Sequence, residues 1–302
     1  MKNTFHGKNV EVLVFDVGAT AVKVGYFSES GTLLAQKRVD TPKYYGSLLQ
    51  LLKIEIDYFN VTHAAIGVPG VILYEKNFIR YSPNMTYLNS RYLVEDFLKI
   101  VPSLKVVMEN DANLAVLGEY MAVCKECKNL VLVTLGTGVG GGAVVNGGLL
   151  KSSVSSFEIG HMKILVDGVL CGCGKRGCFE AYCSKSGFEK LYSDISGNRG
   201  LSVNEIIKKA YSGDKIARIA TNIYGKYLGI GLSNIANIMA PEIIVIGGGI
   251  SELSEYFFKQ TVRVFSKNIF EGYKDRVKLS VSQLKNSAAL YGGYFLLKSS
   301  LG

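Results

Sequence analysis

Three cysteines fall within eight residues of this 302-residue chain, in the segment CGCGKRGC. They are Cys171, Cys173 and Cys178, and His161 precedes the first of them by ten residues. Three thiolates and one imidazole form a standard tetrahedral ligand set for structural zinc, and glycines allow the turns that let such closely spaced cysteines converge. The spacing therefore predicts a closed Zn²⁺ site, with no open position for Lewis-acid chemistry.

The other cysteines are Cys124, Cys127 and Cys183. The N-terminus lacks a cleavable signal pattern, and no apolar run approaches the roughly 18 residues of a membrane span, so we expect a cytoplasmic protein. Thiols stay reduced in that compartment. Cys124 and Cys127 form a C-x-x-C without a second pair or a nearby histidine, which favours inert thiols over a metal or redox site.

The composition, 48% hydrophobic and 20% charged, is that of a globular protein. The net charge is +9, but the 34 Lys and Arg are spread along the chain without a long run. This distribution favours small anionic ligands and makes nucleic acid the weaker interpretation.

Three glycine turns could hold the phosphates of a nucleotide, because glycine lets backbone N–H groups approach an anion and threonine adds a hydroxyl donor. Taken alone, each could equally be a tight turn. Together they favour ATP, with the last turn suited to adenosine. Their residues are Gly18, Ala19 and Thr20, with Lys23 nearby; Gly136, Thr137, Gly138 and Gly140; and Gly247, Gly248 and Gly249.

The second turn also matches the G-x-G-x-x-G pattern of dinucleotide-binding proteins, and Glu158 follows at a suitable distance. In those proteins, however, the glycine loop must open a helix. Here it runs into GAVVNGG, which is typical of a strand, so the context argues against a nicotinamide enzyme.

Two acids stand at element ends. Asp16 ends the first expected strand beside the first glycine turn, where a carboxylate near polyphosphate would hold Mg²⁺. Asn110 and Asp111 stand at the junction of an expected strand and helix. Both types are favoured helix caps, yet a carboxylate there also stays ionised and well aimed as an acceptor for a hydroxyl proton. The residues alone leave both interpretations open.

The elements that must position these residues occur twice. NLVLVTLGTGVGGGAVVNGGLL can be laid on VEVLVFDVGATAVKVGYFSESGTLL with Gly136 on Gly18, an offset of 118 residues. Each copy predicts a strand, a glycine turn and further strands, and helices alternate with strands afterwards. We expect two α/β domains, 1–119 and 120–285, with the zinc loop in the second and a terminal helix, 286–302, packing back on the domains.

DVGATAVK, GVPG, ENDAN, LGTGVGGG, EIGH and CGCGKRGCFEAY, in this order, resemble the ROK family of sugar kinases and repressors. The resemblance covers nearly the whole chain. It implies two actin-like ATPase (ribonuclease H-like) domains with a cleft between them. It also implies ATP with catalytic Mg²⁺, and a homodimer or homotetramer.

The resemblance also implies residue roles. Asp111 is similar to the catalytic base that accepts the proton of the sugar 6-hydroxyl. The implied sugar-binding positions are Gly67, Pro69, Gly70, Asn84, Asn110, Asp111, Glu158, His161 and Glu180. His161 would then serve both zinc and sugar, one ring nitrogen for each.

One departure concerns the residues before Glu158. The family usually has a glycine-spaced stretch ending A-G-E, whereas this chain has Ser156 and Phe157 in place of the small pair. Glycine would let the backbone approach a sugar closely, and Phe157 fills or reshapes that wall.

We therefore expect ATP-dependent phosphorylation of a hexose at the 6-hydroxyl, with glucose as the leading substrate. Other substrates left open are fructose, N-acetylmannosamine, N-acetylglucosamine and β-glucosides, and polyphosphate could replace ATP. A rival is a sugar-sensing repressor of the same family, but only 15 residues precede Asp16, too few for a helix-turn-helix module. A non-catalytic sugar-binding protein is a further alternative. Neither nucleic acid nor membrane is an expected partner.

Overall fold

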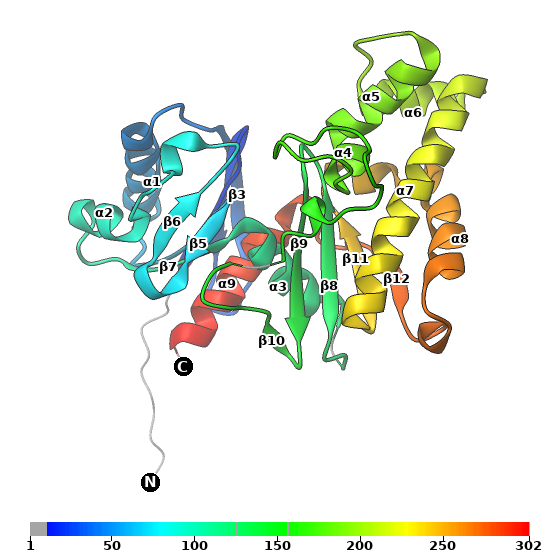
Figure 1. The fold of residues 1–302 in the computed structure, drawn as a ribbon. Coiled ribbons are helices and arrows are strands. Elements are labelled where there is room, and N and C mark those ends of the chain that lie inside the picture. Colours follow the sequence, from blue (N-terminus) through cyan, green and yellow to red (C-terminus); the bar gives the residue numbers. More distant parts are fainter. Residues whose placement is uncertain (1–10, 125, 156, 302) are drawn as a thin grey trace. The chain divides into compact units, whose positions relative to one another are not determined.

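The computed structural model describes residues 11–124, 126–155 and 157–301 (Figure 1). These residues form two compact units, and neither is one continuous piece of chain. The described residues of the first are 11–121, 149–155 and 287–301. The second consists of 122–148 and 157–286. The sequence-based division had assigned 149–156 to the second half of the chain.

The first unit is built on a five-stranded sheet of order β3-β2-β1-β4-β7. β1, β2 and β3 form an antiparallel meander, as expected, whereas β1, β4 and β7 are parallel. A small β5-β6 hairpin, which the sequence pattern did not predict, lies outside this sheet. The elements are β1 Val12–Val17, β2 Ala21–Phe27, β3 Leu33–Asp40, α1 Tyr45–Phe59, β4 His63–Val68, β5 Val71–Leu73, β6 Phe78–Tyr81, α2 Leu93–Ile100, β7 Lys105–Asn110, α3 Asp111–Val123 and α9 Ala288–Leu301.

Strand β1 is buried along its whole length because helices cover both faces of the sheet. On one face Leu13 and Phe15 belong to a core that includes residues of α1 and α2. On the other, Val12 and Val14 pack with Leu290 and other residues of α9, which is red in Figure 1. A strand covered on both faces reads as a continuous apolar run, as VLVF does.

The carboxyl ends of the parallel strands place four proposed site residues close together. Asp16 of β1 is paired with Gly67 of β4. Val68 of β4 is paired with Asn110 of β7, and α3 begins at the next residue, Asp111. This edge of the sheet is where open α/β folds bind ligands.

The second unit repeats the plan, with a five-stranded sheet of order β10-β9-β8-β11-β12. The 118-residue offset lays β1 on β8 and β2 on β9, residue for residue, so the internal repeat is real at the level of strands. The elements are β8 Leu130–Leu135, β9 Val139–Val145, β10 Gly148–Leu149, α4 Glu180–Cys183, α5 Lys185–Ser196, α6 Val203–Tyr211, α7 Lys215–Met239, β11 Ile243–Gly247, α8 Phe258–Asn268 and β12 Lys278–Val281.

Two features of the second unit differ from the pattern. Strand β10 has two residues where its counterpart β3 has eight. After β11 the chain first forms a 3-10 helix, Gly249–Tyr256, before α8. Among the described residues, no helix is long and apolar enough to span a bilayer.

Candidate active site and metal centre

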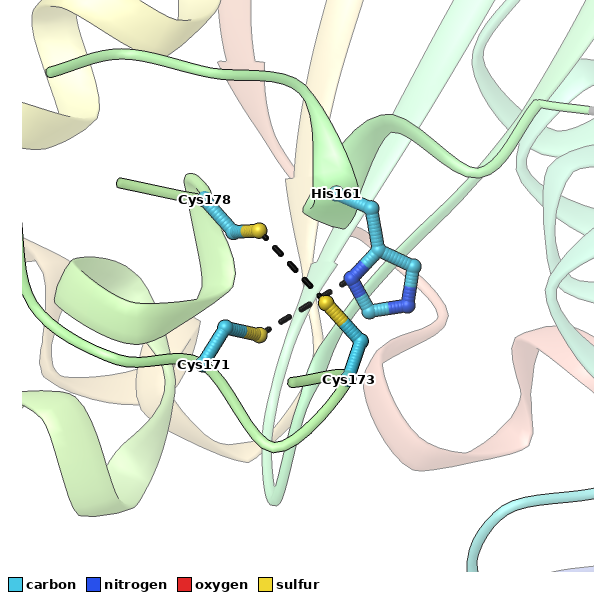
Figure 2. A group of neighbouring side chains, drawn as sticks. All are labelled: His161, Cys171, Cys173 and Cys178. Atoms are coloured by element: carbon cyan, nitrogen blue, oxygen red, sulfur yellow. Dashed lines mark hydrogen bonds between the residues drawn. The ribbon is translucent and has the colours of Figure 1, made fainter. Parts of the chain in front are cut away.

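The predicted zinc ligands converge in the second unit, in the loop between β10 and α4. His161, Cys171, Cys173 and Cys178 turn their side chains toward one another (Figure 2), and their ligand atoms all lie within 4.8 Å of one another. The Sγ atoms of Cys173 and Cys178 are 3.7 Å apart, and Cys171 Sγ is 3.9 Å from His161 Nδ1. Ligands about 2.3 Å from a shared tetrahedral centre lie about 3.8 Å apart, so this set fits Zn²⁺.

The thiols of the cluster have different electrostatic surroundings. Burial raises the pKa of the Cys171 thiol to about 12, whereas a hydrogen bond from the Lys175 backbone lowers the pKa of Cys173. Lys163 Nζ donates to Cys178 Sγ at 2.9 Å. Three thiolates around one divalent ion leave a net negative charge, which this ammonium offsets.

His161 is oriented as a ligand of the cluster. Its Nδ1 faces Cys171, and Figure 2 shows the other ring nitrogen, Nε2, on the far side of the ring. The side chain is exposed. Nε2 is thus available to another partner, as the sequence-based prediction of a double role requires.

Glu180 connects this cluster to a glycine turn. Its Oε2 accepts a hydrogen bond from the Val139 backbone at 3.0 Å, and Cys171 Sγ lies 3.5 Å from its Oε1. A Cβ on Gly138 would come within 2.5 Å of the same carboxylate, so a larger residue there would displace the Glu180 side chain. Lys185 N, just beyond α4, donates to the Gly136 carbonyl at 2.8 Å.

The two glycine turns of the second unit are neighbours. Gly136, Thr137 and Gly138 form the turn between β8 and β9, so the loop runs into a strand and the dinucleotide-binding interpretation fails, as predicted. Gly247 of β11 pairs with Thr134 of β8, and Gly248, at φ +81°, leaves no room for a Cβ against Leu135. Thr137 is exposed at its turn and Gly140 lies in β9.

The first-unit turn, Gly18–Thr20, joins β1 to β2 and is held by a residue that the sequence did not single out. Thr41 donates from Oγ1 to the Gly18 carbonyl at 2.5 Å and from its backbone to Thr20 at 3.2 Å. Ala19 and Thr20 are exposed. Asp16 is buried, and Lys23 Nζ forms an ion pair with its Oδ2 at 2.9 Å.

Asn110 caps α3. Its Oδ1 accepts from the backbones of Ala112 and Asn113 at 2.9 and 3.1 Å, and its Nδ2 donates to the Gly70 carbonyl at 3.1 Å. One amide hydrogen of Asn110 remains for another acceptor. Asp111 opens the helix beside it, partly buried, with Oδ1 2.9 Å from the Ala112 backbone nitrogen. Capping and a ligand role are thus compatible at Asn110.

The GVPG segment lies against this cap. A Cβ on Gly67 would contact Leu114 and approach Asp111 Cα, and one on Gly70, at φ +107°, would collide with Tyr81 and Ser82. These two glycines therefore let the segment approach both α3 and the stretch that contains Asn84, which is exposed. Pro69 lies between the glycines.

The departure from the family pattern has a backbone consequence. Ser156 lies outside the described residues. Phe157 has φ +85°, the left-handed region that favours glycine and is unusual for a bulky side chain. The chain thus keeps a glycine-like backbone just before Glu158, which is exposed, and Phe157 carries the resulting strain.

The prediction of free thiols is wrong for Cys124 and Cys127, which the structure joins in a disulfide. Their Cα atoms are 5.4 Å apart, a separation that a disulfide spans readily. Cys183 is a free, buried thiol outside the zinc cluster, and burial raises its pKa.

Each unit gathers its own part of the predicted site. Sequence reasoning missed the residues that support these parts, chiefly Thr41 and the groups around the buried Glu109, which are Tyr74, Asn113 and Lys151. Glu109 precedes Asn110 directly, but nothing in the spacing distinguishes a buried carboxylate from a surface one. Lys151 is one of 34 Lys and Arg residues, and no motif marks it.

The comparisons with known proteins agree with this arrangement. A glucokinase of Halalkalibacterium halodurans is 30% identical, over 94% of this chain and 93% of the relative. An N-acetyl-D-glucosamine kinase of Erwinia tasmaniensis is 33% identical, over 83% of this chain and 88% of the relative. The structure of a ROK family glucokinase from Streptomyces griseus, in complex with glucose and AMPPNP, matches the fold with a TM-score of 0.83. The identity is 24%, over 97% of this chain and all of that chain.

These matches confirm the predicted α/β fold with its two related sheets and support the expected ATP-dependent sugar kinase activity. The family model named ROK family matches residues 12–300, almost the whole described chain. The chain belongs to the ROK family.

Proposed function

We propose that this protein phosphorylates a hexose, with glucose as the leading substrate, at the 6-hydroxyl with ATP. The observation that carries the proposal is the position of Asp111, at the first turn of α3 directly after β7 and beside the Asn110 cap. A carboxylate at a helix start stays ionised and rigidly aimed. The names of the relatives, glucokinase and N-acetyl-D-glucosamine kinase, support the substrate class.

In the proposed reaction, the Asp111 carboxylate accepts the proton of the 6-hydroxyl while that oxygen attacks the γ-phosphorus and ADP leaves. In the first unit, Asn110 would donate its remaining amide hydrogen to a sugar hydroxyl. Asn84 would add a hydroxyl ligand, and Gly67, Pro69 and Gly70 would form a backbone wall.

Phosphate binding in the first unit is assigned to Gly18, Ala19 and Thr20, whose turn Thr41 holds in place. Asp16 would help to hold Mg²⁺, which neutralises charge on the transferred phosphoryl group when bound. One carboxylate with phosphate oxygens is a usual way to hold this ion, and only Oδ2 of Asp16 is paired with Lys23. Lys23 would turn from Asp16 to phosphate as the nucleotide binds.

In the second unit we assign the phosphates to Gly136, Thr137, Gly138 and Gly140, and the adenosine end to Gly247, Gly248 and Gly249. The two turns are neighbours, because Gly247 of β11 pairs with Thr134 of β8, and this supports the division. Glu158, His161 and Glu180 would bind sugar hydroxyls, since ionised carboxylates act purely as acceptors.

Zinc would be held by His161 Nδ1 and the Sγ atoms of Cys171, Cys173 and Cys178. Four protein ligands leave it no open position, so its contribution is structural. Zinc would keep His161 close to Cys171. Because Cys171 Sγ contacts Glu180 Oε1, it would also help to fix the position of the Glu180 side chain.

ATP is supplied in the cytoplasm, where we place the reaction, and we propose a homodimer or homotetramer. N-acetylglucosamine is the second candidate substrate, because the relative with that activity in its name is 33% identical. Phe157 precedes the proposed sugar ligand Glu158, so its side chain would determine which of the two sugars is preferred.

The test is a coupled ADP-release assay with ATP and Mg²⁺ on glucose, mannose, fructose, N-acetylglucosamine, N-acetylmannosamine and a β-glucoside. We expect the highest kcat/KM with glucose. Turnover confined to an N-acetylated sugar would move the assignment to the second candidate. No turnover with any sugar, together with tight sugar binding, would favour a non-catalytic sensor.

A further inference from the structure

Glu109, the residue before Asn110, is a completely buried carboxylate in the first unit. Three groups surround its Oε1: the Tyr74 hydroxyl, the Asn113 amide at 3.0 Å and the Asn110 backbone N–H at 2.9 Å. Burial and the Glu109 carboxylate raise the pKa of Tyr74, so this phenol stays protonated and donates. The carboxylate therefore anchors the backbone at the residue that caps α3.

Lys151 provides the balancing charge. Its Nζ lies 2.5 Å from Glu109 Oε2 and 4.8 Å from the centre of the Tyr74 ring. A buried carboxylate without a cation is strongly destabilising. Lys151 stabilises this one, although its own side chain is 38% exposed.

Lys151 belongs to segment 149–155, which follows β10 and lies in the first unit. The segment pairs with β5: Ser155 N donates to Ile72 at 2.8 Å, and Tyr74 N donates to Ser153 at 3.2 Å. Ser155 Oγ also reaches the Gly70 carbonyl, 3.2 Å away. Asn110 donates to the same carbonyl, so the segment contacts the α3 cap at two points, Gly70 and Glu109.

We propose that Lys151 and Glu109 are positioning residues for the turn that carries Asn110 and Asp111. Glu109 fixes the backbone of Asn110, and Lys151 pairs with the Glu109 carboxylate and holds it in place. The proposal rests on the proposed function, in which Asp111 is the base. Neither residue touches the reacting atoms.

Loss of the lysine leaves the buried Glu109 carboxylate without its cation, which destabilises its position and weakens the bond to Asn110 N. Small displacements of a base cost large factors in rate. We expect Lys151→Met to lower kcat by about tenfold or more with the KM for ATP within about twofold, because the glycine turns are outside this network. Lys151→Arg keeps the ion pair and should stay within about threefold of wild type.

The experiment compares wild type, Lys151→Met, Lys151→Arg and the double variant Glu109→Gln/Lys151→Met in the glucose assay, with melting temperatures. Lys53→Met is the matched control, since Lys53 forms an exposed ion pair with Asp57 on α1. The double variant has no buried charge, so it should recover part of the kcat that Lys151→Met loses. Wild-type kcat in Lys151→Met would overturn the proposal, as would equal losses in the Met and Arg variants.

Hydrogen–deuterium exchange gives a second readout that does not depend on turnover. The amides of Asn110, Ala112 and Asn113 should exchange about tenfold faster in Lys151→Met, while amides of β1 keep their protection. Unchanged exchange at α3 would overturn the proposal even if the wild type phosphorylates no hexose. Inactivity of the wild type would by itself count against the proposed function only.

Discussion

Glu180 Oε2 accepts a hydrogen bond from the backbone N–H of Val139 at 3.0 Å. This bond joins a proposed sugar ligand to the turn proposed to bind phosphate, within one unit. A side chain larger than glycine at Gly138 would displace this carboxylate. A change at Glu180 is therefore expected to alter the KM values for both ATP and the sugar.

Replacing Glu180 by Ala should raise the KM for ATP by about tenfold, together with the KM for the sugar, because a hydrogen bond to a charged group contributes about 1.5 kcal/mol or more. Glu180→Gln keeps an acceptor for Val139 N, so its KM for ATP should change by less than about threefold. Steady-state kinetics with each substrate varied in turn makes the measurement, with Glu189→Ala on α5 as control. A KM for ATP unaffected in Glu180→Ala would contradict the coupling.

Asp111→Asn should lower kcat by about 10²–10⁴, the usual contribution of a general base. The amide keeps the shape and the helix position, so calorimetry should find glucose binding within about threefold of wild type. Asp57→Asn, exposed on α1, controls for the loss of a surface charge. Equal turnover in Asp111→Asn would remove Asp111 as the base.

Cys178→Ser should lower the zinc content below one ion per chain and the melting temperature by about 5 °C or more, since a structural zinc site stabilises the fold directly. Glucose affinity should fall with it, because His161 and the loop before Glu180 lose their anchor. Cys183→Ala is the matched control: its thiol is equally buried but lies outside the cluster, so zinc content should not change. Unchanged glucose binding in verified zinc-free protein would refute the link between metal and sugar.

Phe157→Gly should be more stable than Phe157→Ala by about 1 kcal/mol, although both lack the ring. The reason is the φ of +85°, which glycine adopts freely and alanine does not. Urea unfolding of the two variants measures the difference. Equal stability would mean that the backbone at this residue carries no strain.

Glu242 gives a pH prediction. Burial opposes its ionisation, but hydrogen bonds from the backbones of Lys128 and Asn129 outweigh this and lower the pKa of the carboxyl. A depressed folded-state pKa adds stability above the unfolded-state pKa of about 4.3 and loses it as the pH falls through the folded-state value. Urea unfolding should find Glu242→Gln less stable than wild type near neutral pH, with the difference vanishing below about pH 4. Glu75→Gln, exposed in the first unit, should show no such trend.

The sequence predicted what depends on local pattern. The offset of 118 residues located both hairpins, and the order of ENDAN located Asp111 at the first residue of α3. The His and Cys spacing identified four side chains that do converge. Such features are visible because turns, strand periodicity and ligand spacing are set by neighbours along the chain.

What the sequence could not predict depends on contacts between distant residues. Lys151 reaches Glu109 only because segment 149–155 pairs with β5. Thr41 donates to Gly18, which lies 23 residues earlier in the chain. Phe157 adopts a positive φ that its side chain disfavours, so this conformation is set by the residues around it. The disulfide of Cys124 and Cys127 went against an expectation drawn from the compartment and from the isolated C-x-x-C.

The two-residue strand β10 has a consequence for dissecting this protein. The second copy of the meander stops at Leu149, and residues 149–155 belong to the first unit, as does α9 near the other end of the chain. A fragment ending at Met121 would expose the apolar face formed by Val12, Val14 and Ala65 and leave Glu109 without its cation. The two halves of the chain are therefore not independent folding units, and truncation at the repeat boundary should yield insoluble protein.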